Sequence, residues 1–284
     1  MKRLQIMLTQ KCNSNCSYCM VSKNNEELDE KIIDNLLEII NQGNFDIIML
    51  FGGEPLLRED LCYAIKEKIG NTKIMLPTNG KLLTDKHIQD FGNILISSNG
   101  TEETCKLTGQ TYIPEILNLV EKDKCTIGMR IIPESAQRMK EDFNYFFSAG
   151  FLKYNIVPII EMDWNNTTYK DYRQGVQYIL SKISRDNIWT WKKGGICVPY
   201  NGTTCIDQTG KFWGCSRLYS DKLKVSSIVK DYHFQKCFNC NIRDYCFHNC
   251  YYLNQIKTGS IINPYKGICK FAELYKEILQ HEKE

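Results

Sequence analysis

Fourteen cysteines stand in this chain of 284 residues, and three of them crowd into one short stretch near the N-terminus. They form the run Cys12-Asn-Ser-Asn-Cys16-Ser-Tyr18-Cys19, directly after an apolar segment. Three thiolates from one loop can hold three irons of a cubane iron–sulfur cluster and leave the fourth iron open. A structural zinc site closes with four ligands, usually from two paired clusters, and no fourth ligand stands nearby. The spacing therefore favours an iron–sulfur cluster over zinc.

A second motif, Gly52-Gly53-Glu54-Pro55, follows the next apolar segment of the chain. Glycines let the backbone approach a ligand closely, and a carboxylate can accept hydrogen bonds from an ammonium group. Alone, such a run is typical of an ordinary turn, because glycine and proline dominate turns. Its position after a predicted strand, behind the three cysteines, favours a ligand-binding loop.

The two motifs together resemble the radical S-adenosylmethionine (SAM) superfamily. That family has the same C-x3-C-x2-C spacing with an aromatic residue, here Tyr18, before the last cysteine. The resemblance implies that Cys12, Cys16 and Cys19 hold a [4Fe-4S] cluster whose open iron chelates SAM. It also implies that an electron from the cluster cleaves SAM to a 5′-deoxyadenosyl radical.

Other positions match the family more loosely, and the resemblance assigns Thr111 and Arg130 to the SAM carboxylate. The alternatives are a helix N-cap for Thr111 and a surface ion pair for Arg130. Where the family often has Ser-x-Asp-Gly, this chain has Asn99 in place of the aspartate, which removes a charge and leaves the role of Asn99 open. The full set expected to bind SAM is Tyr18, Gly52, Gly53, Glu54, Thr78, Asn79, Thr111 and Arg130.

A second series of cysteines occupies the C-terminal third and resembles the SPASM domain of peptide- and protein-modifying radical SAM enzymes. It reads Cys197-x12-Gly210-x4-Cys215, then Cys237-x2-Cys240-x5-Cys246-x3-Cys250, then Cys269. By this resemblance a distal auxiliary [4Fe-4S] cluster is bound by Cys237, Cys240, Cys246 and Cys269, and a proximal one by Cys197, Cys215 and Cys250. The remaining proximal ligand is Cys205, a non-cysteine residue or an open site.

Apolar runs alternate with amphipathic stretches over the first part of the chain. The predicted strands are Leu4–Leu8, Ile47–Phe51, Lys73–Leu76, Ile94–Ser97, Thr126–Ile132 and Lys153–Ile159. The predicted helices are Asp29–Asn41, Glu59–Ile69, Asp85–Phe91, Tyr112–Glu121, Met139–Ala149 and Thr168–Ser184. The pattern predicts an α/β fold with a parallel sheet, a partial (β/α)6 TIM-like barrel. Ligands of such sheets bind beyond the carboxyl ends of the strands, where both motifs lie.

After about residue 186 the sequence becomes rich in Trp, Gly, Tyr and Cys and has few periodic apolar runs. A last helix is predicted near Phe271–His281. We therefore expect a radical SAM barrel over residues 1–186 and a SPASM domain over residues 187–284, held by metal more than by a core. The remaining cysteines, Cys62, Cys105 and Cys125, are expected to be buried or helix-face thiols.

Composition bounds the class of protein. Hydrophobic residues make up 43% and charged residues 24%, which are ordinary globular values. The net charge of +3 is spread along the chain, so a nucleic-acid partner is not expected. The polar N-terminus and the lack of an 18-residue apolar run predict a cytoplasmic protein without a membrane segment. A reducing cytosol favours metal ligation over disulfides for clustered cysteines.

The resemblance implies oxidative modification or cross-linking of a ribosomally made peptide, through a thioether or carbon–carbon bond. The alternatives are a formylglycine-forming, anaerobic sulfatase-maturing type of enzyme and a small-molecule dehydrogenase. Ser216 weakens the first alternative, because sulfatase-maturing enzymes place an aspartate directly after the cysteine corresponding to Cys215. Expected partners are the peptide and an electron donor such as flavodoxin or ferredoxin. Either a separate leader-binding protein delivers the peptide, or the barrel mouth and the small domain recognise it alone.

Overall fold

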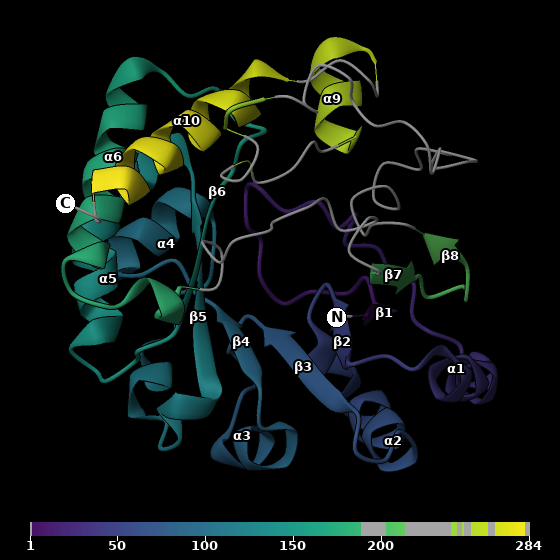
Figure 1. Cartoon of the computed structure of the whole chain (residues 1–284). Coiled ribbons are helices and arrows are strands. Elements are labelled where there is room, and N and C mark those ends of the chain that lie inside the picture. The colour runs from purple at the N-terminus through teal and green to yellow at the C-terminus, as the bar shows by residue number, and fades with distance from the viewer. Residues whose placement is uncertain are drawn as a thin grey trace.

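The computed structural model describes residues 2–188, 203–213, 240–242, 246, 251–260 and 265–281. One sheet organises this part of the chain (Figure 1), in the order β6-β5-β4-β3-β2-β1-β7-β8. Its strands are β1 (Arg3–Thr9), β2 (Ile47–Gly52), β3 (Lys73–Thr78), β4 (Ile94–Ser97), β5 (Cys125–Ile131), β6 (Tyr154–Pro158), β7 (Thr203–Ile206) and β8 (Phe212–Trp213). All neighbours pair in parallel except β7 and β8. The predicted α/β partial barrel with six parallel strands is confirmed, and two later strands extend its sheet.

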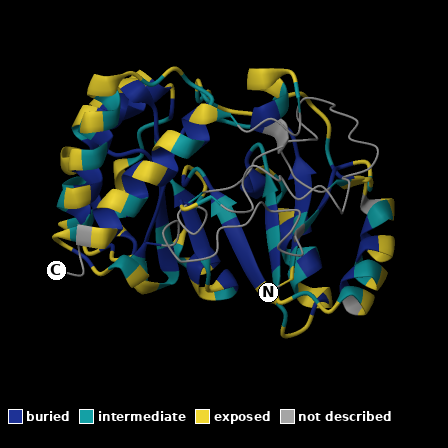
Figure 2. Cartoon of the chain, turned by 45° about the horizontal axis from the view of Figure 1, so that its top comes forward, coloured by how far each residue is buried: buried dark blue, intermediate teal, exposed yellow. Residues whose placement is uncertain are grey.

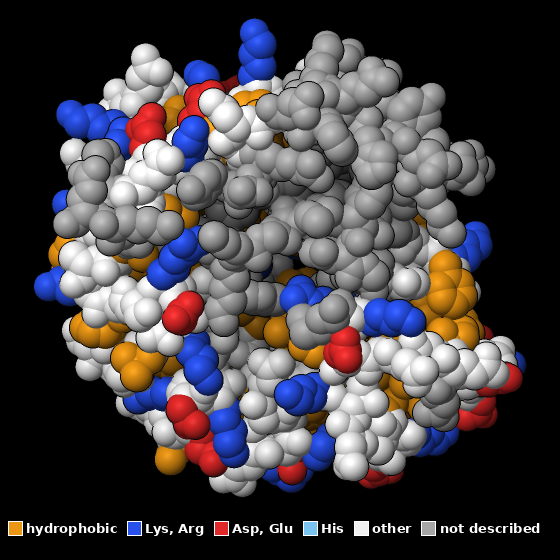
Figure 3. Space-filling view, in the orientation of Figure 1, with side chains coloured by type: hydrophobic (Ala, Val, Ile, Leu, Met, Phe, Trp, Pro, Cys, Tyr) orange, Lys and Arg blue, Asp and Glu red, His pale blue; other side chains and the backbone are white. Residues whose placement is uncertain are grey.

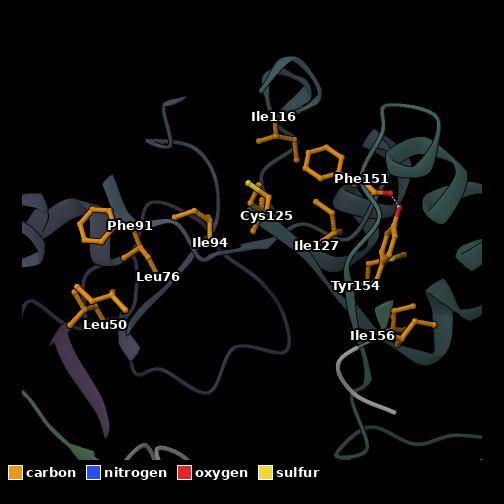
Figure 4. Close-up of a cluster of buried hydrophobic side chains, with 14 of the residues drawn as sticks. Leu50, Leu76, Phe91, Ile94, Ile116, Cys125, Ile127, Phe151, Tyr154 and Ile156 are labelled. Carbon is orange, nitrogen blue, oxygen red and sulfur yellow. Dashed lines mark hydrogen bonds between the residues drawn. The ribbon is translucent and has the colours of Figure 1, made fainter. Parts of the chain in front are cut away.

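The strands are apolar because both faces of the sheet are covered. Leu4, Ile6 and Leu8 on β1 are all fully buried, as are Ile94 and Ile96 on β4. Figure 4 shows part of this core, in which side chains from β2 to β6 meet aromatic and aliphatic residues of the surrounding helices and loops. The core fixes the carboxyl ends of the strands, from which the predicted site loops leave.

Helices connect the strands and cover the outer face of the sheet. They are α1 (Glu30–Gly43), α2 (Glu59–Lys68), α3 (Asp85–Phe91), α4 (Glu102–Thr108), α5 (Met139–Phe147) and α6 (Asn166–Leu180), followed later by α9 (Tyr251–Thr258) and α10 (Lys266–His281). The side chain of Asp29 caps α1 by accepting from the backbone N–H of Lys31, at 3.0 Å. Figure 2 shows buried strands inside and helices whose exposed residues face outward, as expected for amphipathic helices on a core.

The helix predicted over Tyr112–Glu121 is wrong. Only Pro114–Asn118 forms a short 3-10 helix there, whereas the helix after β4 is α4. Pro114 stands in the first turn of this 3-10 helix, a position that proline tolerates. The apolar residues Ile116 and Leu119 are buried, but no α-helix continues through them. The capping signals lay earlier, in Thr101 and in Gly109, which ends α4 with a φ of +67°. Residues 109–112 therefore follow a helix, where the sequence predicted that they precede one.

The C-terminal part returns to the barrel at two separate places. Strand β7 pairs with β1, with Thr203 beside Arg3 and Ile206 beside Ile6. Helix α10 packs on α6, where Phe271 is fully buried. The predicted boundary near residue 186 stays a prediction.

Two surface properties bear on the expected partners. Among the described residues, no helix is both long and apolar enough to cross a membrane. On the described part of the face in Figure 3, Lys and Arg side chains are interspersed with Asp and Glu side chains.

Candidate functional site

The loop that carries Cys12, Cys16 and Cys19 leaves the carboxyl end of β1 and packs against the end of α4. The backbone N–H and the hydroxyl of Ser17 both donate to the carbonyl oxygen of Thr108, at 2.9 and 3.2 Å. A side chain at Gly109 would clash with the loop, because its Cβ would lie 2.6 Å from the carbonyl oxygen of Asn15. The loop is thus held against α4 by backbone and serine contacts, and none of these contacts uses a cysteine thiol.

The three loop cysteines differ in burial from the other cysteines of the barrel. Cys12 and Cys16 are half-buried and Cys19 is exposed, although burial still raises the pKa of Cys12. The prediction that the others are buried is confirmed for Cys62, Cys105 and Cys125. Burial raises the pKa of Cys105 to about 11 and that of Cys125 to about 12, so these core thiols stay protonated at neutral pH.

The donor set of the loop, three cysteine thiols, fits a cysteine-ligated cluster. Within the ranges that the structure describes, no three Cys, His, Asp or Glu side chains converge as they would around one metal ion. In a cubane cluster each thiolate binds its own iron, so three sulfurs need not meet at one point. Three accessible thiols on one anchored loop match that requirement.

The Gly52-Gly53-Glu54-Pro55 loop lies directly against the start of the cysteine loop. The backbone N–H of Gly53 donates to the carbonyl of Thr9, and that of Glu54 donates to the carbonyl of Lys11, both at 2.8 Å. A Cβ at Gly52 would overlap the Thr9 carbonyl, and one at Gly53 would overlap that of Lys11. These glycines are needed for the approach of two loops, a role distinct from the approach to a ligand expected from the sequence.

Glu54 joins three segments through its carboxylate, which is only 1% exposed. It accepts from the backbone N–H of Leu56 at 3.1 Å, the Thr78 hydroxyl at 2.8 Å and the backbone N–H of Asn79 at 2.7 Å. Burial raises the pKa of Glu54, against the effect of these three hydrogen bonds. A carboxylate has room for about four hydrogen bonds. Its predicted contact with SAM stays a prediction, since three acceptor positions already serve the loops after β2 and β3.

Asn79 carries this network on to the cysteine loop. Its side-chain amide donates to Asn13 Oδ1 at 2.6 Å, and the same nitrogen lies 3.9 Å from the Cys12 sulfur. The Asn79 oxygen accepts from the backbone N–H of Lys81 at 3.0 Å, which settles the orientation of the amide. The loops after β1, β2 and β3 thereby form one connected unit.

Asn99 connects the other side of the cysteine loop to the loops after β4 and β5. Its side-chain nitrogen donates to the Tyr18 hydroxyl at 2.9 Å, and its side-chain oxygen accepts from the backbone N–H of Arg130 at 2.9 Å. Its own backbone N–H donates to Gln110 Oε1 at 2.8 Å. Asn99 is fully buried, so the role left open in the sequence is a structural connection among three loops.

Thr111 and Arg130 both hydrogen-bond to residues of these connected loops, Thr111 to Ser14 and the Arg130 backbone to Asn99. The backbone N–H and hydroxyl of Thr111 donate to the Ser14 hydroxyl at 3.2 and 3.4 Å, and that hydroxyl lies 3.6 Å from the Cys16 sulfur. Thr111 is not a helix N-cap, because Ile113 precedes the 3-10 helix that follows. The guanidinium of Arg130, on β5, donates to the carbonyl of Asn155 at 3.5 Å. Their contact with the SAM carboxylate stays a prediction.

Part of the predicted auxiliary-cluster set can be placed. Cys240, Cys246 and Cys269 are half-buried. Cys205 is buried in β7, between register partners on β1 and β8, and the predicted turn glycine Gly210 has a φ of +79°. Four further predicted ligands lie outside the described residues: Cys197, Cys215, Cys237 and Cys250.

The hairpin of β7 and β8 contacts the base of the cysteine loop. Glu26 accepts from the Gln10 amide at 2.9 Å and from the Gln208 amide. Gln10 and Gln208 are buried. The turn that leads toward the predicted auxiliary ligand Cys215 is thereby linked to the residue two positions before Cys12.

Sequence reasoning assigned no role to Ser14, Gln110 or Gln208, and it left Asn99 undecided. Ser14 lies inside the cysteine motif and Asn99 directly follows a strand, so their positions were a usable signal. Gln208 had none, because its partner Glu26 is far away in the sequence.

Comparison with known proteins agrees with this arrangement. Residues 6–99, which contain both motifs, match a family described as the Radical SAM superfamily. A GTP 3′,8-cyclase from Clostridium perfringens is 31% identical over 172 residues, which cover 57% of this chain and 52% of that protein. A probable GTP 3′,8-cyclase from Methanothermobacter marburgensis is 34% identical over 87 residues, or 29% of this chain and 28% of that one. At best, this chain therefore spans about half the length of these curated relatives.

Two solved structures share the fold over most of the chain. The structure of anSMEcpe with bound AdoMet has a TM-score of 0.71 at 14% identity and covers 99% of this chain and 98% of that one. Streptococcus suis SuiB bound to the precursor peptide SuiA has a TM-score of 0.62 at 16% identity, covering 94% and 75%. Both motifs lie within the segment of this chain that is similar to the radical SAM superfamily.

Proposed function

We propose that this protein is a radical SAM enzyme with a SPASM-type C-terminal region that oxidatively modifies or cross-links a ribosomally made peptide. The observation that carries the peptide proposal is the extent of the structural likeness. The chain follows anSMEcpe over 99% of its own length, and another structure of that protein holds the Cp18Cys peptide. At such low identity the likeness shows the fold alone, so the substrate is our inference.

Cys12, Cys16 and Cys19 would hold the [4Fe-4S] cluster that the family implies. When bound, this cluster supplies the electron that cleaves SAM to a 5′-deoxyadenosyl radical, which abstracts hydrogen from an unactivated carbon. Glu54 and Asn99 would act as positioning residues, because each joins the cysteine loop, directly or through one side chain, to two further strand ends. A connected unit of this kind holds reacting groups in register.

Residues 187–284 would hold two auxiliary [4Fe-4S] clusters on the cysteine series of the C-terminal third. In this proposal Cys240, Cys246 and Cys269 serve the distal cluster together with Cys237. The proximal cluster is bound by Cys197, Cys215 and Cys250, and Cys205 is a candidate for its remaining ligand. Replacement of Cys240 by Ala should then leave SAM cleavage intact but abolish product formation.

A nucleotide is the second candidate substrate. It is favoured by the 31% identity to a GTP 3′,8-cyclase, which exceeds the 14% and 16% identity to the peptide-bound structures of anSMEcpe and SuiB. The two proposals share the SAM site and differ only in what the radical attacks. They are therefore separable without any change in the SAM assay.

The test compares substrates on anaerobically reconstituted, reduced protein. Peptides encoded beside the gene and GTP are each supplied with SAM, and 5′-deoxyadenosine is measured with each. The peptide proposal predicts a several-fold rise in 5′-deoxyadenosine with a peptide, together with a peptide product that has lost hydrogen by mass spectrometry. A rise with GTP and none with any peptide would establish the second candidate in its place.

A further inference from the structure

Ser14 is the side chain that connects Thr111 to the cysteine loop. It stands between Cys12 and Cys16 in the sequence and is only 8% exposed. Its hydroxyl oxygen accepts from the backbone N–H of Thr111 at 3.2 Å and from the Thr111 hydroxyl at 3.4 Å. The same oxygen lies 3.6 Å from the Cys16 sulfur, a distance at which the two groups hydrogen-bond. Three groups therefore share one buried serine hydroxyl.

The direction of the hydrogen bond between Ser14 and Cys16 follows from what each group can donate. A hydroxyl has one hydrogen and two acceptor positions. The backbone N–H of Thr111 can only donate, and together with the Thr111 hydroxyl it fills both acceptor positions of the Ser14 oxygen. A cysteine that ligates iron is a thiolate and has no hydrogen to give. The one hydrogen of the Ser14 hydroxyl is thus directed to the Cys16 sulfur when Cys16 holds a cluster.

Ser14 is better placed for such a hydrogen bond than Asn79, which approaches a different sulfur of the loop. The Asn79 amide nitrogen lies 3.9 Å from the Cys12 sulfur, and one of its two hydrogens already serves Asn13 at 2.6 Å. Asn79 is also only half-buried, whereas Ser14 is buried. A hydrogen bond shielded from water is electrostatically stronger than an exposed one. The contact from Ser14 should therefore have the larger effect on the electrons of a cluster.

We propose that Ser14 donates its hydroxyl hydrogen to the Cys16 sulfur and thereby raises the reduction potential of the cluster that Cys16 holds. Ser14 is a positioning residue, since it acts through Cys16, and Thr111 fixes the direction of its hydroxyl. Hydrogen bonds to ligating sulfurs are among the factors that set the potential of iron–sulfur clusters. A donor favours the reduced state because reduction adds negative charge to the cluster. The inference rests on the proposed function, since it requires the cluster.

The test is a reductive titration of the reconstituted full chain, followed by electron paramagnetic resonance. The relevant signal is the one that changes when SAM is added, which separates this cluster from the proposed auxiliary ones. Ser14→Ala removes the hydroxyl and should lower the ratio of reduced to oxidised cluster at a fixed potential by up to about tenfold, a shift of about 59 mV for one electron. Ser14→Thr and Ser14→Val form a pair of nearly equal shape that differs in the hydroxyl. The threonine variant should keep a potential near that of the wild type, and the valine variant should fall with the alanine one.

Ser17 provides a matched control in the same loop, because its hydroxyl donates to the carbonyl oxygen of Thr108 at 3.2 Å and not to a sulfur. Ser17→Ala should leave the potential unchanged. An unchanged potential in Ser14→Ala would overturn the inference, as would an equal fall in Ser17→Ala. If Ser14→Ala loses its cluster, equal potentials in Ser14→Thr and Ser14→Val overturn it instead. A wild type without any SAM-responsive cluster overturns the proposed function as well, whereas the other results concern this inference alone.

Discussion

The cysteines of the N-terminal loop and those of the barrel core are the same residue in two opposite settings. In the loop, Cys19 is exposed and its neighbours Ser14 and Ser17 make the anchoring hydrogen bonds. In the core, Cys62 and Cys105 are buried, and burial raises their pKa values. The comparison teaches that a cysteine can bind a cluster only where its loop is held in place and its sulfur is accessible. A buried thiol in the core meets the first condition but not the second.

The largest effect should come from exchanging one cysteine in each setting. Cys16→Ala should remove the SAM-cleaving cluster and reduce iron content by about one third, if three clusters are present. Cys105→Ala should keep the iron and the activity, and should lower the free energy of unfolding by about 1–2 kcal/mol through lost packing. Iron analysis and chemical denaturation measure both. Equal loss of iron in the two variants would remove the distinction between loop and core.

Glu54→Gln should be the most damaging change to the anchoring itself. One carboxylate oxygen would become an NH2 group facing a donor, Asn79 N–H or Thr78 hydroxyl, inside a buried site. We expect a loss of about 3 kcal/mol in unfolding free energy, with a several-fold fall in 5′-deoxyadenosine formation. Glu59→Gln is the control, since the Glu59 side chain is half exposed and its partner is the ring of the buried His87. Equal effects of the two variants would contradict the role assigned to Glu54.

Asp142 should give a smaller, pH-dependent effect on the same loops. Its carboxylate accepts from the backbone N–H and hydroxyl of Thr101 and from the Thr104 hydroxyl, and burial raises its pKa from 3.8 to about 6. Because the folded pKa is the higher one, its contribution is greatest below pH 3.8 and is lost as the pH rises through 6. Wild type should therefore gain about 2 kcal/mol relative to Asp142→Asn as the pH falls from about 6 to about 4. The free energies of unfolding of the two proteins are measured by urea denaturation across this pH range. If they change with pH in parallel, the prediction is wrong.

The smallest effect concerns the contact between α6 and α10. Tyr172 and Tyr275 are both buried, and their hydroxyls hydrogen-bond each other. Tyr172→Phe should cost about 1 kcal/mol because it leaves the Tyr275 hydroxyl without that partner, while the double Phe variant should be nearly neutral. Thermal unfolding of the two single variants and the double variant tests this. A double variant weaker than either single one would show that the pair adds stability of its own.

The fold was predictable because hydrophobic periodicity records burial, which is a local property of each strand. All six strands of the barrel lie where the sequence predicted, within a few residues at their ends. The helix predicted over Tyr112–Glu121 was wrong because the prediction followed the spacing of apolar residues. The capping residues Thr101 and Gly109 mark the actual helix, α4. The pairing of β7 with β1 was not predictable, since register between distant strands depends on tertiary packing.

The site was predictable in its ligands but not in its connections. Cysteine spacing and the glycine motif identify the loops, because these residue types are required by the chemistry or by close backbone approach. The hydrogen bonds of Asn99 to Tyr18 and Arg130 join positions on separate loops. No pattern in a single sequence indicates such pairs of distant residues. Which group donates and which accepts can be read only from the folded structure.

The central claim is that the loop of Cys12, Cys16 and Cys19 supports radical SAM chemistry. Its most direct test is the amount of 5′-deoxyadenosine formed from SAM by anaerobically reconstituted, dithionite-reduced protein. The control is the same protein with these three cysteines replaced by alanine. The account predicts 5′-deoxyadenosine from the wild type and only background from the triple variant. Equal amounts from both proteins would contradict it.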